Sequence, residues 1–244
     1  DSIGDSAFYG CIGIDSLCIG SGVQTIGASA FSSCTGLKYL FYNAQNCNNG
    51  TFPVGTVSPF YNTPLLTTLV IGDSVETIPN NAFYNCSSIN NLQIRATVQK
   101  IGDNAFRGCS GIHQLIIPDG VISIGDNAFY GCSGIDSLLI GNGITTIENG
   151  VFHGCSSIQK LVIPANITSI GNDAFYGCTG IEKISFGNGL ESIGNSAFQG
   201  CNGFSKLVIP ESVNSIGSNA FYGCTSIDSL YIGSGVQTIG SGAF

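Results

Sequence analysis

Cysteine is the most abundant residue type here with reactive chemistry, since the chain has eleven cysteines and two histidines. Thiolates bind metals, form disulfides and act as nucleophiles. Nine of the eleven share one position of a repeating pattern, in which Thr63 takes the same position once. These nine are Cys11, Cys34, Cys86, Cys109, Cys132, Cys155, Cys178, Cys201 and Cys224.

A column of stacked thiols favours packing over chemistry. Metal sites need ligands that converge from different directions, and no Cys-x-x-Cys pair supplies them here. Side chains that all point inward from stacked positions also fit the dihedral angle of a disulfide poorly. We therefore expect buried free thiols that fill a core, with no metal and no cofactor.

Two cysteines lie outside this column, Cys18 in an outward strand position and Cys47 in a segment that resembles a loop. A disulfide between them would tie the loop to the sheet, but connectivity cannot be deduced from sequence alone. The histidines, His113 and His153, occupy different repeat positions and have no partners for acid–base chemistry. We therefore predict that the protein is not an enzyme.

The elements that position these residues are internal repeats marked by phenylalanine. The spacing is 23 residues in every case but one, where it is 29. A unit of this size cannot bury its own apolar side, so it must stack on copies of itself. The marker residues are Phe8, Phe31, Phe60, Phe83, Phe106, Phe129, Phe152, Phe175, Phe198, Phe221 and Phe244.

Each repeat predicts one main strand. In 135–140 the apolar residues Ile135, Leu138 and Ile140 face inward, and Gly141 then ends the strand. A second, minor strand is predicted at Thr146–Ile147, and the Asn-Ala-Phe segment is expected to form a helical or 3₁₀ turn. About ten repeats at ~4.8 Å each give a scaffold roughly 50 Å long.

The repeat pattern carries a resemblance to a known family. The consensus Ile-Gly-x-x-Ala-Phe-x-Gly-Cys-x-x-Ile-x-x-Leu-x-Ile-Pro resembles the BspA-type (Treponema pallidum-type) leucine-rich repeat over essentially the whole chain. The resemblance implies a mainly β leucine-rich-repeat solenoid, a right-handed curved stack with a parallel sheet on its concave face. It also implies an extracellular or cell-surface protein that adheres to host or matrix glycoproteins or to other cells.

We expect residues 1–244 to form a single solenoid domain. Both chain ends fall inside a repeat, which suggests a fragment of a longer protein, because solenoid ends need caps. The repeat between Phe31 and Phe60 carries a six-residue insertion within 43–59. Its turn-forming composition predicts a surface loop, which is more often tolerated than functional.

Charge narrows the partners. Only 9% of the residues are charged, and seven Lys and Arg against fifteen Asp and Glu give a net charge of −8. Nucleic-acid binding depends on basic residues that neutralise phosphates, so we expect none. We also expect no membrane insertion, since no apolar run approaches the length of a span. The predicted partner is a protein or glycan.

The outward strand positions supply the candidate binding surface. One column is almost continuously apolar, and three lysines stack beside it on consecutive repeats, which suggests an anionic group on the partner. Neither feature requires a binding role, because other segments of the protein could cover the stripe and the lysines could simply be solvated. The candidate ligand-binding residues are Tyr39, Phe41, Val70, Ile116, Leu139, Val162, Val208, Tyr231, Lys160, Lys183 and Lys206.

Two rival functions remain open. The first is a structural or assembly subunit that self-associates through the solenoid ends. The second is an ice-binding or other regular surface, suggested by a Thr/Ser column that Lys100 interrupts. Candidate N-glycosylation sites at Asn49, Asn85 and Asn166 matter only in a secreted eukaryotic protein.

Overall fold

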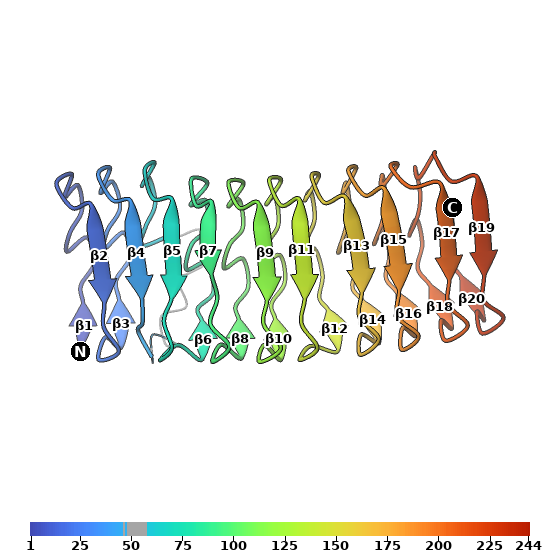
Figure 1. Cartoon of the computed structure of the whole chain (residues 1–244), viewed down its shortest axis with the longest axis horizontal. Coiled ribbons are helices and arrows are strands. Elements are labelled where there is room, and N and C mark those ends of the chain that lie inside the picture. Colours follow the sequence, from blue (N-terminus) through green and yellow to red (C-terminus); the bar gives the residue numbers. More distant parts are fainter. Residues whose placement is uncertain (46, 48–57) are drawn as a thin grey trace.

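The computed structural model describes residues 1–45, 47 and 58–244, which form a row of stacked rungs (Figure 1). Within the described residues a rung typically contributes a long strand to one side and a two-residue strand to another, although no two-residue strand is described between Tyr42 and Thr68. The long strands are β2 (Ser16–Ile19), β4 (Tyr39–Tyr42), β5 (Thr68–Ile71), β7 (Asn91–Gln93), β9 (Gln114–Ile117), β11 (Ser137–Ile140), β13 (Lys160–Ile163), β15 (Lys183–Phe186), β17 (Lys206–Ile209) and β19 (Ser229–Ile232).

The short strands form the second side of the stack and lie behind the long strands in Figure 1. Thr146–Ile147 is among them, which confirms the minor strand expected from the sequence. They are β1 (Ser2–Ile3), β3 (Thr25–Ile26), β6 (Thr77–Ile78), β8 (Lys100–Ile101), β10 (Ser123–Ile124), β12 (Thr146–Ile147), β14 (Ser169–Ile170), β16 (Ser192–Ile193), β18 (Ser215–Ile216) and β20 (Thr238–Ile239).

All strand pairing is parallel and keeps equivalent repeat positions in register. The long strands hydrogen-bond as four groups: β2-β4-β5-β7, β9-β11, β13-β15 and β17-β19. Lys160 pairs with Lys183, and Val162 pairs with Ser185, so each repeat position becomes a column along the stack. The mainly β solenoid of 23-residue repeats predicted from the sequence is confirmed.

The third side of each rung consists of turns. The Asn-Ala-Phe segment is neither helical nor 3₁₀, which corrects the sequence expectation, because Asn127 adopts a left-handed φ of 57°. A left-handed residue breaks a right-handed helix, and Asn tolerates that conformation better than most residues. The turns still bond between rungs, since the Phe106 amide donates to the Ala128 carbonyl at 2.8 Å.

Side-chain amides add another ladder along the stack. The Oδ1 atom of Asn149 accepts a hydrogen bond from the Asn172 backbone amide at 2.9 Å, and Oδ1 of Asn172 accepts from Asn195 at 2.8 Å. Each such bond satisfies a backbone donor that lies outside the strands. The turns are therefore fixed to their neighbours, which keeps the rungs in one register.

The core is a single apolar column system enclosed by these three sides. Ala128, Phe129 and Cys132 have no exposed surface, and the equivalent residues of most rungs are equally buried. The phenylalanine rings stack along the axis, with Phe129 lying 5.3 Å from Phe106 and 5.8 Å from Phe152 between ring centroids. The inward positions predicted from the sequence are therefore confirmed.

Candidate functional site

The solvent-facing side of the long strands, called the outer face below, carries the candidate site. Burial alternates along these strands, so that Lys160 and Val162 are exposed while Leu161 and Ile163 are buried. Alternation of this kind places the first and third residues of each strand on one surface. Strand pairing then aligns those positions into the two columns predicted from the sequence.

The apolar column is exposed over its second half. Here the exposed fractions are 48% for Ile116, 60% for Leu139, 48% for Val162, 44% for Val208 and 52% for Tyr231. A partner that covers these side chains would remove their apolar surface from water, which contributes about 25 cal/mol of binding free energy per Å² buried. We define the outer-face stripe as these five residues together with Ser185, which lies between Val162 and Val208.

The first half of the column does not form the continuous exposed stripe predicted from the sequence. Val70 is only 6% exposed, and Phe41 is half-buried. The register places Val70 directly between Phe41 and Gln93, whose larger side chains flank it on both sides. Val70 therefore packs between its neighbours and offers almost no surface to a partner, so it does not belong to the candidate binding residues.

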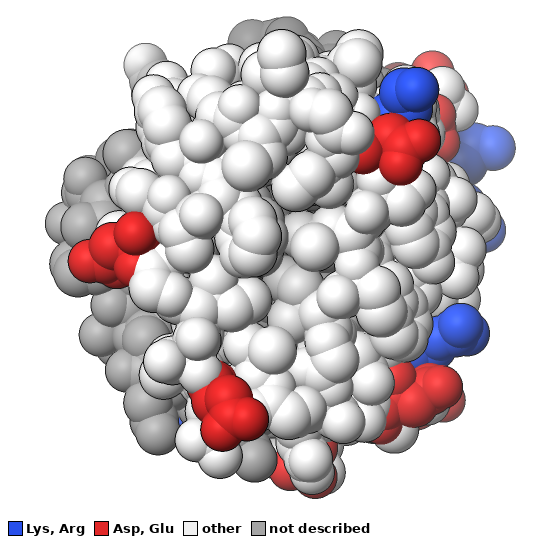
Figure 2. Space-filling model, turned by 90° about the vertical axis from the view of Figure 1, so that its left-hand side faces the viewer, with Lys and Arg blue, Asp and Glu red and all other residues white. Residues whose placement is uncertain are grey.

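The lysine column lies beside the stripe at the first position of β13, β15 and β17. Lys160, Lys183 and Lys206 are exposed, and Tyr39 occupies the same position on β4 with 39% exposure. In the part of the chain that the structure describes, no carboxylate lies within 4.0 Å of these three ammonium groups. In Figure 2, which faces the end of the stack near β1, the visible basic side chains lie on the long-strand side.

A pocket of about 550 Å³ opens on the outer face between β15 and β17. It lies where the stripe has its smallest residue, Ser185, and where two neighbouring strands are not hydrogen-bonded to each other. Glu182 lines its edge. Its main lining residues are Lys183, Ser185, Phe186, Lys206, Val208 and Pro210.

Sequence reasoning missed this pocket, although a signal was present. Ser185 is a small polar residue in a column of large apolar ones, and it stands between two lysines of the neighbouring column. Sequence reasoning also missed a contact of Tyr231, whose hydroxyl donates to Oε1 of Glu211. This hydrogen bond raises the pKa of Tyr231 and fixes its ring at the end of the stripe.

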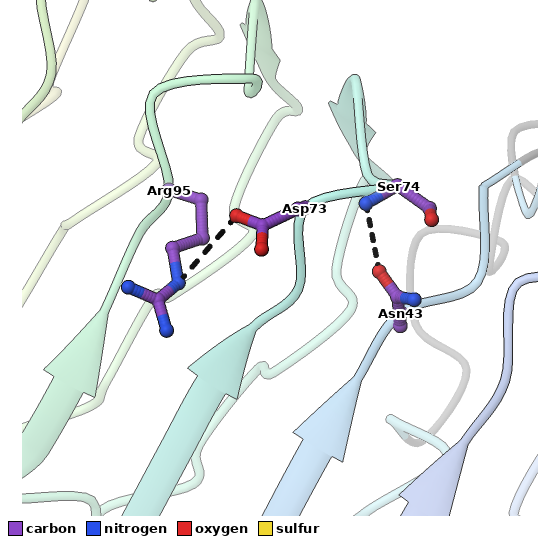
Figure 3. A network of polar contacts seen from close by, with 4 residues as sticks. All are labelled: Asn43, Asp73, Ser74 and Arg95. Carbon is purple, nitrogen blue, oxygen red and sulfur yellow. Dashed lines mark hydrogen bonds and ion pairs between the residues drawn. The ribbon is translucent and has the colours of Figure 1, made fainter.

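The turns that follow the long strands are tied together by polar contacts (Figure 3). The Ser74 amide donates to Oδ1 of Asn43 at 2.8 Å, and Nε of Arg95 lies 3.7 Å from Oδ1 of Asp73. The Arg95 and Asp73 side chains are 48% and 81% exposed. Such a solvated pair contributes little stability, so these contacts mainly order the rim beside the outer face.

The cysteine column is part of the core and not of a reactive site. From Cys34 onward, the thiols of the cysteine column donate to the phenylalanine carbonyl of the preceding rung, as Cys132 does to Phe106 at 3.1 Å. Burial raises the pKa of Cys132 to about 12, so its thiolate is scarce at neutral pH. Among the described residues, no group of three or more His, Cys, Asp or Glu side chains could hold a metal ion.

The structure contradicts the disulfide suggested for Cys18 and Cys47, because both thiols are free. Cys18 is exposed on the outer face of β2, whereas Cys47 belongs to the buried core near Tyr42. The two side chains therefore point to different sides of the sheet. Most of the inserted segment within 43–59 lies outside the described residues.

The two histidines occupy different columns of the stack. Nδ1 of His113 is 3.7 Å from a carboxylate oxygen of Asp136 at the surface. His153 stacks between Tyr130 and Tyr176, with ring centroids 4.3 and 4.6 Å away. The pKa of His153 is lowered overall, chiefly by burial. Asp173 opposes this shift, and Arg107 adds to it. This stack is a structural column in which histidine replaces tyrosine.

Of the candidate glycosylation residues, Asn49 lies outside the described residues. Asn85 is exposed in a left-handed turn with a φ of 58°. Asn166 is half-buried, and its amide donates to the Ile144 carbonyl, so a glycan there would displace a rung contact.

The fold and the columns define the class of this protein: a leucine-rich-repeat solenoid. Comparison with known families then gives a specific assignment, because the BspA type leucine rich repeat region, in six copies, matches residues 1–57, 56–181 and 145–244. The chain therefore belongs to the BspA-type leucine-rich repeat family. No curated protein has a significantly similar sequence.

Solved structures resemble this chain at low sequence identity, and two of them share its fold with TM-scores of 0.50 or more. A leucine-rich repeat protein from Eubacterium ventriosum is 18% identical with a TM-score of 0.58, covering 93% of this chain and 80% of its own. The pneumococcal vaccine antigen PcpA is 19% identical with a TM-score of 0.50, covering 93% of this chain and 65% of its own. The T. pallidum leucine rich repeat protein is 19% identical with a TM-score of 0.43, covering 93% and 71%.

The structure has no helix, among its described residues, long and apolar enough to cross a membrane.

Proposed function

We propose that this chain is a non-catalytic scaffold of an extracellular or cell-surface protein, and that it binds a macromolecule through the outer face. The observation that carries the proposal is the side-by-side arrangement, on the stacked long strands, of five exposed apolar side chains and three lysines that have no ion pair among the described residues. Exposed apolar patches larger than a few hundred Å² usually mark interaction sites.

The rigidity of the face supports a binding role. The stripe and the lysines lie on hydrogen-bonded strands whose opposite side is the packed core. The backbone of the face is therefore already ordered, so little backbone conformational entropy is lost when a partner binds. A flat surface of this length suits a macromolecular partner, and we propose a protein or glycan of the matrix or of another cell.

Two findings support the proposed surface location. The chain belongs to the BspA-type family, and a protein of similar fold is named as a vaccine antigen.

A second candidate function is self-association through the ends of the stack. At the end shown in Figure 2 the centre is uncharged, and Tyr9 and Ile12 are 62% and 70% exposed. Sedimentation over a wide concentration range would distinguish a monomer from an assembly.

The ice-binding alternative gains little from the structure. The Thr/Ser column lies on the short strands, but Lys100 takes its place on β8, and most of its hydroxyl-bearing residues are only half-exposed. A regular lattice of hydroxyls needs unbroken repetition over a flat exposed surface. The outer face is therefore the stronger candidate.

Charge reversal in the lysine column tests the proposal. We expect the triple variant Lys160→Glu, Lys183→Glu and Lys206→Glu to lose at least about tenfold in affinity for the partner, because three contacts become repulsive. The measurement is equilibrium binding to a panel of matrix glycoproteins and sulfated or sialylated glycans. Circular dichroism and the urea midpoint check that the variant folds.

The matched control is Lys100→Glu, which reverses a lysine on the short-strand side. Equal binding by the wild type, the triple variant and the control would remove the lysine column from the site. Absence of binding to every member of the panel would favour the self-association candidate.

A further inference from the structure

The pocket between β15 and β17 combines two chemical properties. Phe186, Val208 and Pro210 give its lining apolar surface, whereas Lys183 and Lys206 add two positive charges and Glu182 adds one negative charge. An occupant with an apolar side chain beside a carboxylate would satisfy both. A purely anionic ligand would leave the apolar lining residues in contact with water, so their burial would contribute nothing to binding.

The charge around the pocket favours a negative partner. The chain carries a net charge of −8, yet three of its seven basic residues share one column, and none of the three has a carboxylate within 4.0 Å among the described residues. Lys160 and Lys183 are direct neighbours in the parallel register. Like charges at this separation repel, so a row of carboxylates on a partner would relieve the repulsion.

The spacing of the lysines fits a helix laid along the axis of the stack. Adjacent strands lie ~4.8 Å apart, so Lys160 and Lys206 are separated by roughly 9.6 Å. Two helical turns advance ~10.8 Å, a difference that flexible lysine side chains can absorb. Alternate residues of an extended strand advance ~6.8 Å, so two steps would overshoot by roughly 4 Å.

A helix also matches the second column. The lysine and stripe positions are two residues apart on each strand, or roughly 6.6 Å, which lies within the ~10 Å width of a helix. An amphipathic helix presents an apolar row beside a charged row, which is the pattern of the outer face. A sulfated glycan supplies the anionic row but has no matching row of apolar side chains.

We infer that the outer face binds an acidic amphipathic helix of a partner protein. In this arrangement the helix carboxylates lie against Lys160, Lys183 and Lys206, and one large apolar side chain enters the pocket above Ser185. The inference rests on the proposed function and names its partner class. Ser185 is then a specificity determinant, because its small size leaves room for the anchoring side chain.

The test uses a synthetic helical peptide with glutamates at i, i+4 and i+7 and a leucine after each glutamate. Its control peptide has lysines in place of the glutamates, and heparin serves as a glycan probe. The chain variant Ser185→Leu fills the pocket with a residue that the same column accepts at Leu139. The matched control Gln93→Leu makes a similar change in that column, away from the pocket.

We expect the glutamate peptide to bind the wild type, to bind Ser185→Leu at least about tenfold more weakly, and to bind Gln93→Leu as it binds the wild type. The variant Lys183→Glu with Lys206→Glu should weaken peptide binding similarly, and the lysine peptide should not bind. Urea midpoints close to that of the wild type confirm that each variant is folded.

Two results would overturn the inference. One is equal affinity of the glutamate peptide for the wild type and for Ser185→Leu. The other is binding of heparin without binding of the glutamate peptide, which would make the lysine column a glycan site. In both cases the proposed function would still stand if a panel ligand depended on the outer face, so the two failures are distinguishable.

Discussion

Raising the pH from 9 to 10 should reduce the free energy of unfolding steeply, because core thiols stay protonated in the folded protein. Burial raises the pKa of Cys86 and Cys132 from 9.0 to about 12, and it raises that of Cys109 and Cys155 well above 9.0. The unfolded chain releases these protons near pH 9, whereas the folded chain retains them. The unfolded state therefore binds fewer protons, and stability falls as pH rises.

The expected slope is large. Each such thiol contributes at most about 1.4 kcal/mol per pH unit, and this limit is approached only above its unfolded pKa, so four thiols contribute roughly 4 kcal/mol between pH 9 and 10. Below about pH 9 this stabilisation is fully present. Urea unfolding at several pH values between 8 and 10, in the presence of a reducing agent, measures the slope. The upper limit of the range equals the ordinary tyrosine pKa of 10.0, so buried Tyr42, whose pKa burial raises, adds a smaller contribution of the same sign near pH 10.

Threonine supplies the matched control. Thr63 occupies the cysteine position in one rung and donates to the Phe60 carbonyl at 2.8 Å, so the column accepts this residue. The double variant Cys109→Thr and Cys132→Thr should lose roughly 2 kcal/mol less between pH 9 and 10 than the wild type, because two titrating groups are removed. An unchanged slope in that variant would show that the alkaline effect has another origin.

Replacing Phe129 by alanine should destabilise the protein by about 3 to 5 kcal/mol. The ring is fully buried and stacks on Phe106 and Phe152, so its loss leaves a cavity and removes contacts with both neighbouring rungs. In a solenoid, stability depends on such nearest-neighbour interfaces. The measurement is the urea dependence of the far-ultraviolet circular dichroism at neutral pH.

The control for this variant is Leu139→Ala, which truncates an exposed residue of the stripe. We expect that substitution to change stability by less than about 1 kcal/mol. If Phe129→Ala cost no more than Leu139→Ala, the phenylalanine column would not be the structural core described above.

The repeat made most of the fold predictable. Because residues 23 positions apart must stack, the apolar columns of Ala128, Phe129 and Cys132 could be assigned to the interior from the sequence alone. The short strand at Thr146–Ile147 followed from the same logic. The turn segment was predicted wrongly, because nothing in the identity of Asn127 alone distinguishes a left-handed turn from the start of a helix.

The site was less predictable, because it depends on lateral neighbours. The column position predicts that Val70 faces outward. Only the structure shows that Val70 is buried there, with Phe41 and Gln93 as its neighbours on the two adjacent strands. The pocket at Ser185 likewise lies between β15 and β17, two neighbouring strands that are not hydrogen-bonded to each other, which a repeat consensus does not encode. The disulfide suggested for Cys18 and Cys47 was wrong for a similar reason, because the sequence does not show that Cys18 is exposed while Cys47 is buried.

If the outer-face stripe is the binding surface, polar substitution of its residues should weaken binding. We would measure the affinity of Leu139→Asn with Val162→Asn for a partner from the panel, beside the control Ile122→Asn, whose exposed side chain precedes the short strand β10. We predict at least about a tenfold loss for the stripe variant and no change for the control. Unchanged affinity of a folded stripe variant, or an equal loss in the control, would contradict the claim.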